Sequence, residues 1–136
     1  MSEDSANTQR KHTRLLIKVN AEVKTNSGLT LSGHTRNLSF GGGFINLDDT
    51  SNCESYLGLE CQLTLQLGSR DDPILVPVQS KVTRYDSQGI GLEFISTTIE
   101  GYWQFKNLMV YNSPESDGLL QELETHPGLE ANLSPN

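Results

Sequence analysis

Two arginines spaced four residues apart, Arg10 and Arg14, are the side chains best suited to bind an anionic ligand. They lie in segment 10–24, which holds half of the ten Lys and Arg residues of the chain. A guanidinium group can form two parallel hydrogen bonds with a phosphate or with the O6/N7 edge of guanine, and it can stack on a base. The pair could therefore grip one compact ligand that carries both phosphate and purine. The simpler alternative is a solvated terminus whose charges aid solubility.

The segment RNLSFGGG, residues 36–43, combines an amide, a hydroxyl and three glycines. Asn37 and Ser39 lie two residues apart at the end of an expected strand, so both side chains should point to the same face. An amide and a hydroxyl beside bare backbone can read the hydrogen-bonding edge of a base. Alternatively, they satisfy their own backbone in a local turn, which is the favoured interpretation when the segment is taken alone. The glycines could form a bulge or a tight barrel corner, expose backbone to a ligand, or do both.

Neither catalysis nor metal binding is indicated elsewhere in the chain. The histidines, His12, His34 and His126, are not accompanied by a nucleophile motif or a zinc-binding motif. Cys53 and Cys61 do not form a CxxC motif and lack the spacing of metal ligands. We therefore predict a protein that is not an enzyme and that holds no metal and no cofactor.

Charge and hydropathy limit the classes of partner. The 136-residue chain has ten Lys and Arg against seventeen Asp and Glu, a net charge of −7. The summed field of such a protein repels DNA, RNA and anionic membrane surfaces, but it tolerates one small anion at a local basic site. No stretch approaches the ~20 apolar residues of a membrane helix, and the polar, acidic N-terminus does not resemble a secretory signal. We expect one domain, soluble and cytoplasmic, without membrane insertion.

The elements that would position these residues are mostly strands. From Leu15 to Lys24, apolar and polar residues alternate with a period of two, which indicates a half-buried strand. Pro77 indicates an edge position or a bulge in a later strand. Six strands with short connections predict a small antiparallel barrel or sandwich. The five strand-like stretches after the first are residues 29–39, 44–47, 61–68, 74–85 and 90–95.

At Thr97 the apolar period changes to three and four residues, which predicts one amphipathic helix from about 98 to 111. Thr97 and Glu100 would form a capping box at its start, whereas Gly101 lowers the helix propensity. We expect the helix to lie on the barrel. The recurring apolar positions are Ile99, Tyr102, Trp103, Phe105 and Met109.

Taken together, Arg10 and Arg14 form an RxxxR motif before the first strand, and Asn37, Ser39 and Gly42 form a [D/N]xSxxG motif after it. This combination resembles the PilZ domain, a bacterial family of receptors for the second messenger cyclic di-GMP. Segment 82–94 is similar to the closing hairpin of the family. The resemblance implies an all-β, six-stranded antiparallel β-barrel with a C-terminal α-helix and flexible termini. The domain would span 9–112, after a flexible arm at 1–8 and before an acidic flexible tail at 113–136 that could form a short helix.

The resemblance also implies roles for individual residues. Arg10 and Arg14 would contact the phosphates and a guanine, Asn37 and Ser39 would read a guanine edge, and Gly42 would let the base lie against the barrel. Members that bind an intercalated ligand dimer tend to carry a further arginine where this chain has a glutamine. The secondary ligand-binding candidates are Gln9, Lys11, His12, Arg36, Gly41, Gly43, Arg84 and Gly91.

We therefore expect a non-enzymatic receptor for cyclic di-GMP whose N-terminal arm orders on the ligand and whose reshaped surface signals to a partner protein. The alternative is a PilZ-like interaction adaptor that binds no nucleotide. An oligonucleotide-binding barrel would need a basic groove with exposed aromatic residues, which the net charge disfavours. A hydrolase acting on the messenger would need metal-binding carboxylates and histidines that the sequence does not offer.

Overall fold

Alternating apolar and polar residues fold most of this chain into strands. The structure is a computed structural model that describes residues 14–68, 71–112 and 130–132. It contains no helix, in these ranges, that is long and apolar enough to cross a bilayer. The elements in chain order are β1 (Asn20–Thr25), β2 (Thr30–Leu38), β3 (Gly42–Leu47), the 3-10 helix η1 (Cys53–Tyr56), β4 (Glu60–Gly68), β5 (Pro73–Tyr85), β6 (Gly89–Thr98), α2 (Ile99–Asn112) and β7 (Glu130–Asn132).

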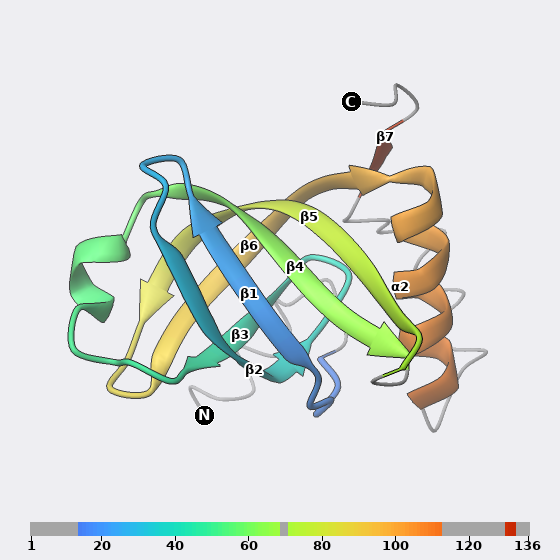
Figure 1. Cartoon of the computed structure of the whole chain (residues 1–136), viewed down its shortest axis with the longest axis horizontal. Coiled ribbons are helices and arrows are strands. Elements are labelled where there is room, and N and C mark those ends of the chain that lie inside the picture. The colour runs from blue at the N-terminus through green and yellow to red at the C-terminus, as the bar shows by residue number, and fades with distance from the viewer. Residues whose placement is uncertain (1–13, 69–70, 113–129, 133–136) are drawn as a thin grey trace, which may run out of the picture.

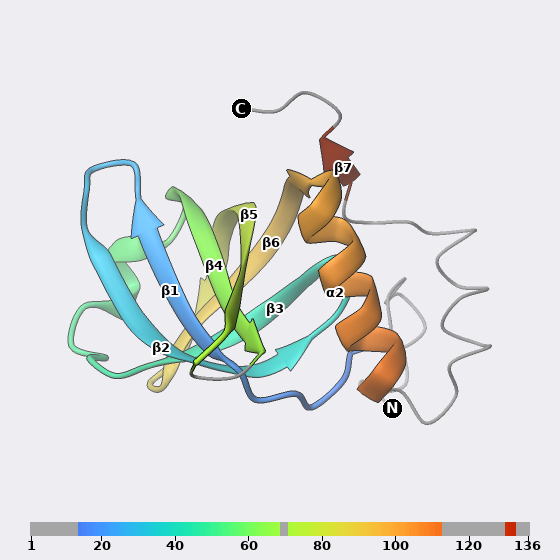
Figure 2. The same ribbon diagram turned by 45° about the vertical axis from the view of Figure 1, so that its right-hand side comes forward.

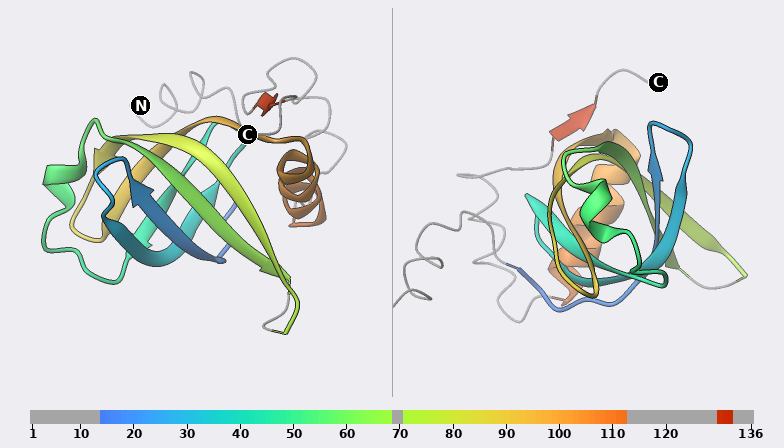
Figure 3. Two further views of the ribbon diagram at one scale, coloured as in Figure 1. Left: turned by 45° about the horizontal axis from the view of Figure 1, so that its top comes forward. Right: turned by 90° about the vertical axis from the view of Figure 1, so that its left-hand side faces the viewer.

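The first six strands form a closed antiparallel barrel (Figures 1 and 3). The strand order is β3-β2-β1-β4-β5-β6, and pairing of β3 with β6 closes the ring. The helix α2 follows at one end of the barrel, and η1 lies at the opposite end (Figures 1 and 2). This is the barrel with a C-terminal helix that the sequence predicts.

The interior is filled by the residues on one face of each strand. Val23 of β1 pairs with Leu31 of β2 and with Leu63 of β4, and all three side chains are buried. Such a layer repeats along the barrel because strand side chains alternate between the two faces. Each fully buried Val or Leu contributes roughly 1.5–3 kcal/mol relative to an exposed one. The interior therefore supplies the stability, and the outer face is available for chemistry.

The segment before β1 alternates as predicted, but it pairs differently. Leu15 forms an isolated bridge with Leu38, with backbone hydrogen bonds of 2.8 and 2.9 Å, and the regular ladder begins only at Asn20. Between these points the Thr35 hydroxyl accepts the Val19 N–H at 2.9 Å and donates to the Ile17 carbonyl. A buried side chain thus replaces backbone partners, which the alternation alone does not reveal.

The helix starts one residue later than the predicted capping box. The Thr98 hydroxyl, not that of Thr97, accepts a helix-start N–H, from Gly101 at 2.9 Å. Thr97 instead donates to the Pro77 carbonyl of β5. A Cβ on Gly101 would lie 2.5 Å from the Thr97 hydroxyl oxygen, so the glycine allows the helix to begin tightly against the strand. Trp103 is 53% exposed and lies outside the core.

The end of the barrel is closed by the inner side of α2. Phe105 and Met109 are fully buried, and the Phe105 ring meets Phe40 and Phe94 edge-on at centroid distances of 5.3 and 5.8 Å. These contacts join the helix to β6 and to the turn after β2. The inner residues of the helix are therefore part of the barrel core.

A short seventh strand was not predicted. β7 pairs in parallel with β6, with Glu130 opposite Ser96 and Asn132 opposite Thr98. Three polar or small residues carry no alternation, so the sequence pattern gives no signal for it. The expected short helix in the tail lies outside the described residues.

Candidate ligand-binding site

The outer face carries one continuous row of residues across four strands. Asn37 of β2 pairs with Phe44 of β3, Phe44 pairs with Gly91 of β6, and Gly91 pairs with Arg84 of β5. The antiparallel Leu15–Leu38 bridge places the backbone of Arg14 beside that of Ser39. The structure thus brings Arg14, Asn37 and Ser39 to one region of the barrel.

Two β-bulges, one in β2 and one in β5, lie beside this row and change the direction of nearby side chains. In β2 the register shifts between Thr35 and Asn37, so Arg36 is the additional residue. In β5 it shifts between Val82 and Arg84. A bulge opposes two residues to one and can turn a side chain that would otherwise point inward. Because Thr35 and Leu38 are buried in the barrel wall, the bulge leaves Arg36 and Asn37 together on the outer side.

Ser39 shapes the turn between β2 and β3. Its hydroxyl oxygen accepts the N–H groups of Gly41 and Gly42 at 3.2 and 3.1 Å and donates to the Gly42 carbonyl at 3.1 Å. The Ser39 N–H donates to the same carbonyl at 2.8 Å, and Ser39 is only 3% exposed. This is the local turn that the sequence offered as an alternative to base reading.

Asn37 has the opposite environment. Its side-chain oxygen is buried and accepts no hydrogen bond from the described residues. A buried acceptor without a donor costs roughly 1–3 kcal/mol relative to a satisfied one. The Asn37 amide therefore retains an unused acceptor beside the bulge.

The glycines after Ser39 permit close backbone packing. A Cβ on Gly42 would lie 2.3 Å from the Leu92 carbonyl oxygen of β6, and one on Gly43 would lie 2.8 Å from the Asn37 carbonyl oxygen. Both glycines are buried, whereas Gly41 is partly exposed and its carbonyl accepts the Phe94 N–H at 3.0 Å. Close packing of β3 against β6 at Gly42 and against β2 at Gly43 thus explains two of the three glycines.

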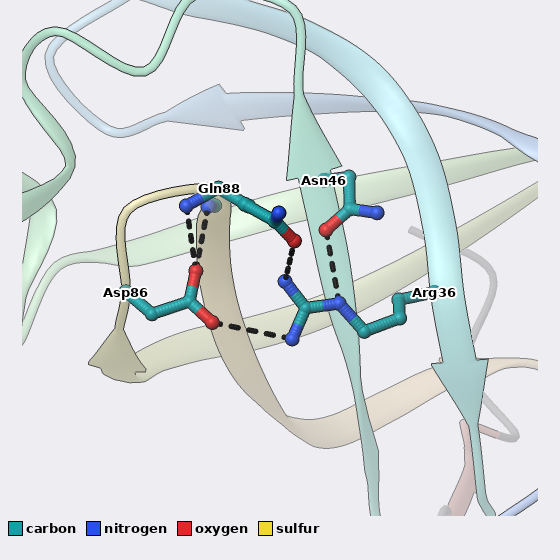
Figure 4. Close-up of polar contacts among 5 residues, drawn as sticks. Arg36, Asn46, Asp86 and Gln88 are labelled. Atoms are coloured by element: carbon teal, nitrogen blue, oxygen red, sulfur yellow. Dashed lines mark hydrogen bonds and ion pairs between the residues drawn. The ribbon is translucent and has the colours of Figure 1, made fainter.

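Arg36 lies at the centre of a polar cluster on the outer face (Figure 4). Its Nε–H donates to Asn46 Oδ1 at 3.1 Å, Nη1 donates to Asp86 Oδ2 at 3.2 Å, and Nη2 donates to Gln88 Oε1 at 2.9 Å. Figure 4 shows these side chains converging from β2, β3 and the β5–β6 turn. The cluster fixes the plane of a guanidinium that the sequence ranked only second.

Hydrogen bonds within the β5–β6 turn orient the Asp86 carboxylate toward Arg36. Its Oδ1 accepts the N–H groups of Gln88 at 2.7 Å and Gly89 at 3.1 Å. Although partial desolvation opposes ionisation, the Gln88 N–H, the Arg36 guanidinium and the Gly89 N–H together lower the pKa of Asp86 below its usual value. The carboxylate is therefore charged at neutral pH.

Phe44 is a site residue that the sequence reasoning missed. It is only 4% exposed but does not belong to the barrel core, because the guanidinium carbons of Arg36 and Arg84 lie 3.9 and 5.6 Å from its ring centroid. A Cβ on Gly91 would lie 2.5 Å from Arg84 Cγ, so the Arg84 side chain crosses that glycine. Since Ile45 and Leu47 point inward, the alternation of FINL already placed Phe44 outside.

The structure also bears on metal binding and on the reactivity of the two cysteines. The described residues contain no group of three or more His, Cys, Asp or Glu side chains that could hold a metal. Cys53 and Cys61 are buried free thiols, and burial raises the pKa of Cys61 to about 11, which disfavours a nucleophilic thiolate.

Four of the predicted site residues lie outside the described residues, namely Gln9, Arg10, Lys11 and His12.

The closed barrel, the terminal helix and the polar outer wall define a binding domain. Residues 8–109, which are most of the chain, match the PilZ domain, and the chain therefore belongs to the PilZ domain family. Domains of this family are receptors for cyclic di-GMP or adaptors and not enzymes.

Solved structures with the same fold include a PilZ domain and an inhibitor of motility. The PilZ domain of CeSA from a cellulose-synthesizing bacterium has a TM-score of 0.51 at 13% identity, with 71% of this chain and 93% of that chain covered. The Bacillus subtilis inhibitor of motility, MotI/DgrA, has a TM-score of 0.56 at 14% identity, with 87% of this chain covered. The chain spans about half of that protein, 52% of its length. A comparison with curated protein sequences found no match.

Proposed function

We propose that this protein is a cytoplasmic receptor for cyclic di-GMP that binds its ligand on the outer face of the barrel around Asn37. Arg10 and Arg14 would fold over the ligand, and the ordered arm would present a changed surface to a partner protein. The observation that carries the proposal is the buried Asn37 oxygen, which has no hydrogen-bond donor among the described residues.

The chemistry of the ligand matches the residues in this region. Guanine offers donors at N1 and N2, and an amide oxygen can accept from either of them. The two phosphates carry two negative charges, which guanidinium groups bind through paired, charge-assisted hydrogen bonds. Arg14 is next to Ser39 in the bridged backbone, so a ligand held by Asn37 would lie within its range.

The Ser39 turn would act indirectly. Its hydroxyl is engaged with Gly41 and Gly42, so it supports the shape of the β2–β3 corner and leaves the direct base contact to Asn37. The ligand must favour the ordered state of the arm over the free one for signalling to result. The quantity that decides this is how much more tightly the ligand binds when the arm is ordered than when it is free.

Titration calorimetry with cyclic di-GMP tests the proposal directly. Loss of one charged contact in Arg10→Ala or Arg14→Ala should cost about 2–3 kcal/mol, which is roughly 30- to 150-fold in affinity. Lys24→Ala is the matched control, because it removes one positive charge from an exposed position near the β1–β2 turn. Unchanged affinity in both arginine variants would remove the arm from the mechanism.

The second candidate is an adaptor that binds no nucleotide. The internal use of the Ser39 hydroxyl favours it, and a structural neighbour that is an inhibitor of motility is consistent with it. Wild-type protein that gives no binding heat at roughly tens of micromolar ligand would support the adaptor and reject the receptor.

A further inference from the structure

We propose that the Arg36 guanidinium is a fixed platform on which one guanine base of cyclic di-GMP stacks. This inference deepens the proposed function and rests on it. It assigns to Arg36 a role in positioning a base, whereas the sequence offered it only as a secondary ligand-binding candidate.

The edges of the Arg36 guanidinium are already engaged. Nε, Nη1 and Nη2 each donate to a different side chain, those of Asn46, Asp86 and Gln88. These hydrogen bonds lie in the guanidinium plane, because that is the direction in which arginine donors point. A further ligand can therefore approach most easily through a face of the group.

One face of the guanidinium is covered and the other is directed outward. The inner face lies over the Phe44 ring, with 3.9 Å between the guanidinium carbon and the ring centroid. The Arg36 side chain is still 32% exposed, which leaves area on the side away from Phe44. Stacking of a base there would continue the column of Phe44 and Arg36, an arrangement that guanidinium groups favour.

Stability alone does not account for the cluster. A surface ion pair of this kind contributes little to the stability of a protein. Here the pair is supplemented by two neutral acceptors and an aromatic ring, which remove the rotational freedom of a long side chain. Such preorganisation is useful when a group must present one surface in one orientation.

The position of Arg36 suits this role because the β2 bulge places it beside Asn37. One residue would offer a plane for a purine, and its neighbour would offer an acceptor for a purine N–H. Stacking gives affinity to any purine, whereas the acceptor favours guanine. The two contacts together would explain why a bulge occurs at this point of the strand.

Titration calorimetry of Arg36→Lys with cyclic di-GMP separates the plane from the charge. The lysine keeps the positive charge but loses the flat surface, and we expect the affinity to fall on the order of tenfold. Lys24→Arg, a charge-conserving exchange at an exposed residue of β1, is the matched control and should bind like wild type. Asp86→Asn, which weakens the orientation of Arg36, should give a smaller loss than Arg36→Lys.

A purely structural role is distinguished by two further measurements. Thermal unfolding of the unliganded variants shows whether each one folds, and only folded variants enter the comparison. In NMR, addition of cyclic di-GMP should shift the Arg36 Nε–H resonance of wild-type protein while its protection from exchange persists, because the bond to Asn46 remains.

The outcomes separate this inference from the proposed function. Wild-type protein that binds the ligand, together with a folded Arg36→Lys variant of equal affinity and an unshifted Nε–H resonance, overturns the platform and leaves the receptor standing. Wild-type protein that does not bind cyclic di-GMP overturns both. Binding that is weakened on the order of tenfold in Arg36→Lys and unchanged in Lys24→Arg supports both.

Discussion

Asn37 and Ser39 belong to one short motif, yet their side chains do different work. Ser39 uses its hydroxyl three times within the β2–β3 corner, whereas the Asn37 oxygen is buried without a partner. The first arrangement stabilises the fold, and the second is a local cost that a ligand could relieve. Residues that weaken a free protein in this way commonly belong to functional sites.

This division predicts opposite effects on folding and binding for Asn37→Ala. Removal of an unsatisfied acceptor should leave the free energy of unfolding unchanged or raise it by about 1 kcal/mol, while affinity for cyclic di-GMP falls. Asn46→Ala is the control, because the same truncation there removes a paired oxygen and should lower the stability by about 1 kcal/mol. Urea denaturation and calorimetry measure the two quantities. A clear loss of stability in Asn37→Ala would contradict the assignment of its oxygen.

The lowered pKa of Asp86 predicts a pH effect on stability. Because the pKa of the carboxyl is lower in the folded protein than in the unfolded chain, its contribution is present above the unfolded value of about 4 and is lost as the pH falls through the folded value. The apparent melting temperature of wild-type protein should therefore fall more steeply in this acid range than that of Asp86→Asn. Parallel pH profiles for the two proteins would contradict this prediction, because they would show that ionisation of Asp86 does not contribute to the pH dependence of stability. The contribution is small because the side chain is 44% exposed.

Among the elements, strand existence followed from the sequence more readily than strand geometry. The alternation around Val23, Leu63 and Leu65 is sufficient to predict the two strands that contain them, since one face of each has to be buried. The bulge at Arg36 was not predictable, because it depends on which residues of β3 lie opposite. Similarly, two adjacent threonines could each cap α2, and the choice of Thr98 is decided by the bond of Thr97 to β5.

The helix start offers a direct test of that choice. Thr98→Ala should lower the free energy of unfolding by about 1 kcal/mol, because the Gly101 N–H loses its acceptor. Glu100→Ala removes the other member of the predicted capping box and should have little effect, within about 0.5 kcal/mol. Thermal unfolding of both variants provides the comparison. An equal loss of stability in the two variants would instead support the capping box that begins at Thr97.

For the whole molecule, barrel and helix share one core through Phe105. Its ring contacts Phe40 and Phe94, so unfolding of α2 should not precede that of the barrel. Phe105→Ala is expected to cost about 3–5 kcal/mol, whereas Tyr111→Ala, at a residue that is 90% exposed, should change the stability by less than about 0.5 kcal/mol. Trp103 fluorescence and far-UV circular dichroism should report one coincident urea transition. Two separate transitions would mean that the helix is an independent unit.

The overall architecture was predictable, and so was the clustering of the candidate site residues, but the contacts within that candidate site were not. The paired motifs with Arg14, Asn37 and Gly42 indicated the family, and the structure brings these positions to one side of the barrel. The role of Phe44 was missed because the alternation of FINL places its ring on the outer face but does not distinguish an exposed ring from one covered by two arginines. Long-range pairings decide that difference.

Pairing of β3 with β6 seals the cylinder, and this has a practical consequence for engineering. Side chains on its outer wall can be exchanged while the interior packing is left intact. A library confined to positions 14, 36, 37 and 84 could therefore search for altered nucleotide preference with little risk of misfolding. The same separation would let natural selection retune the messenger without redesigning the scaffold.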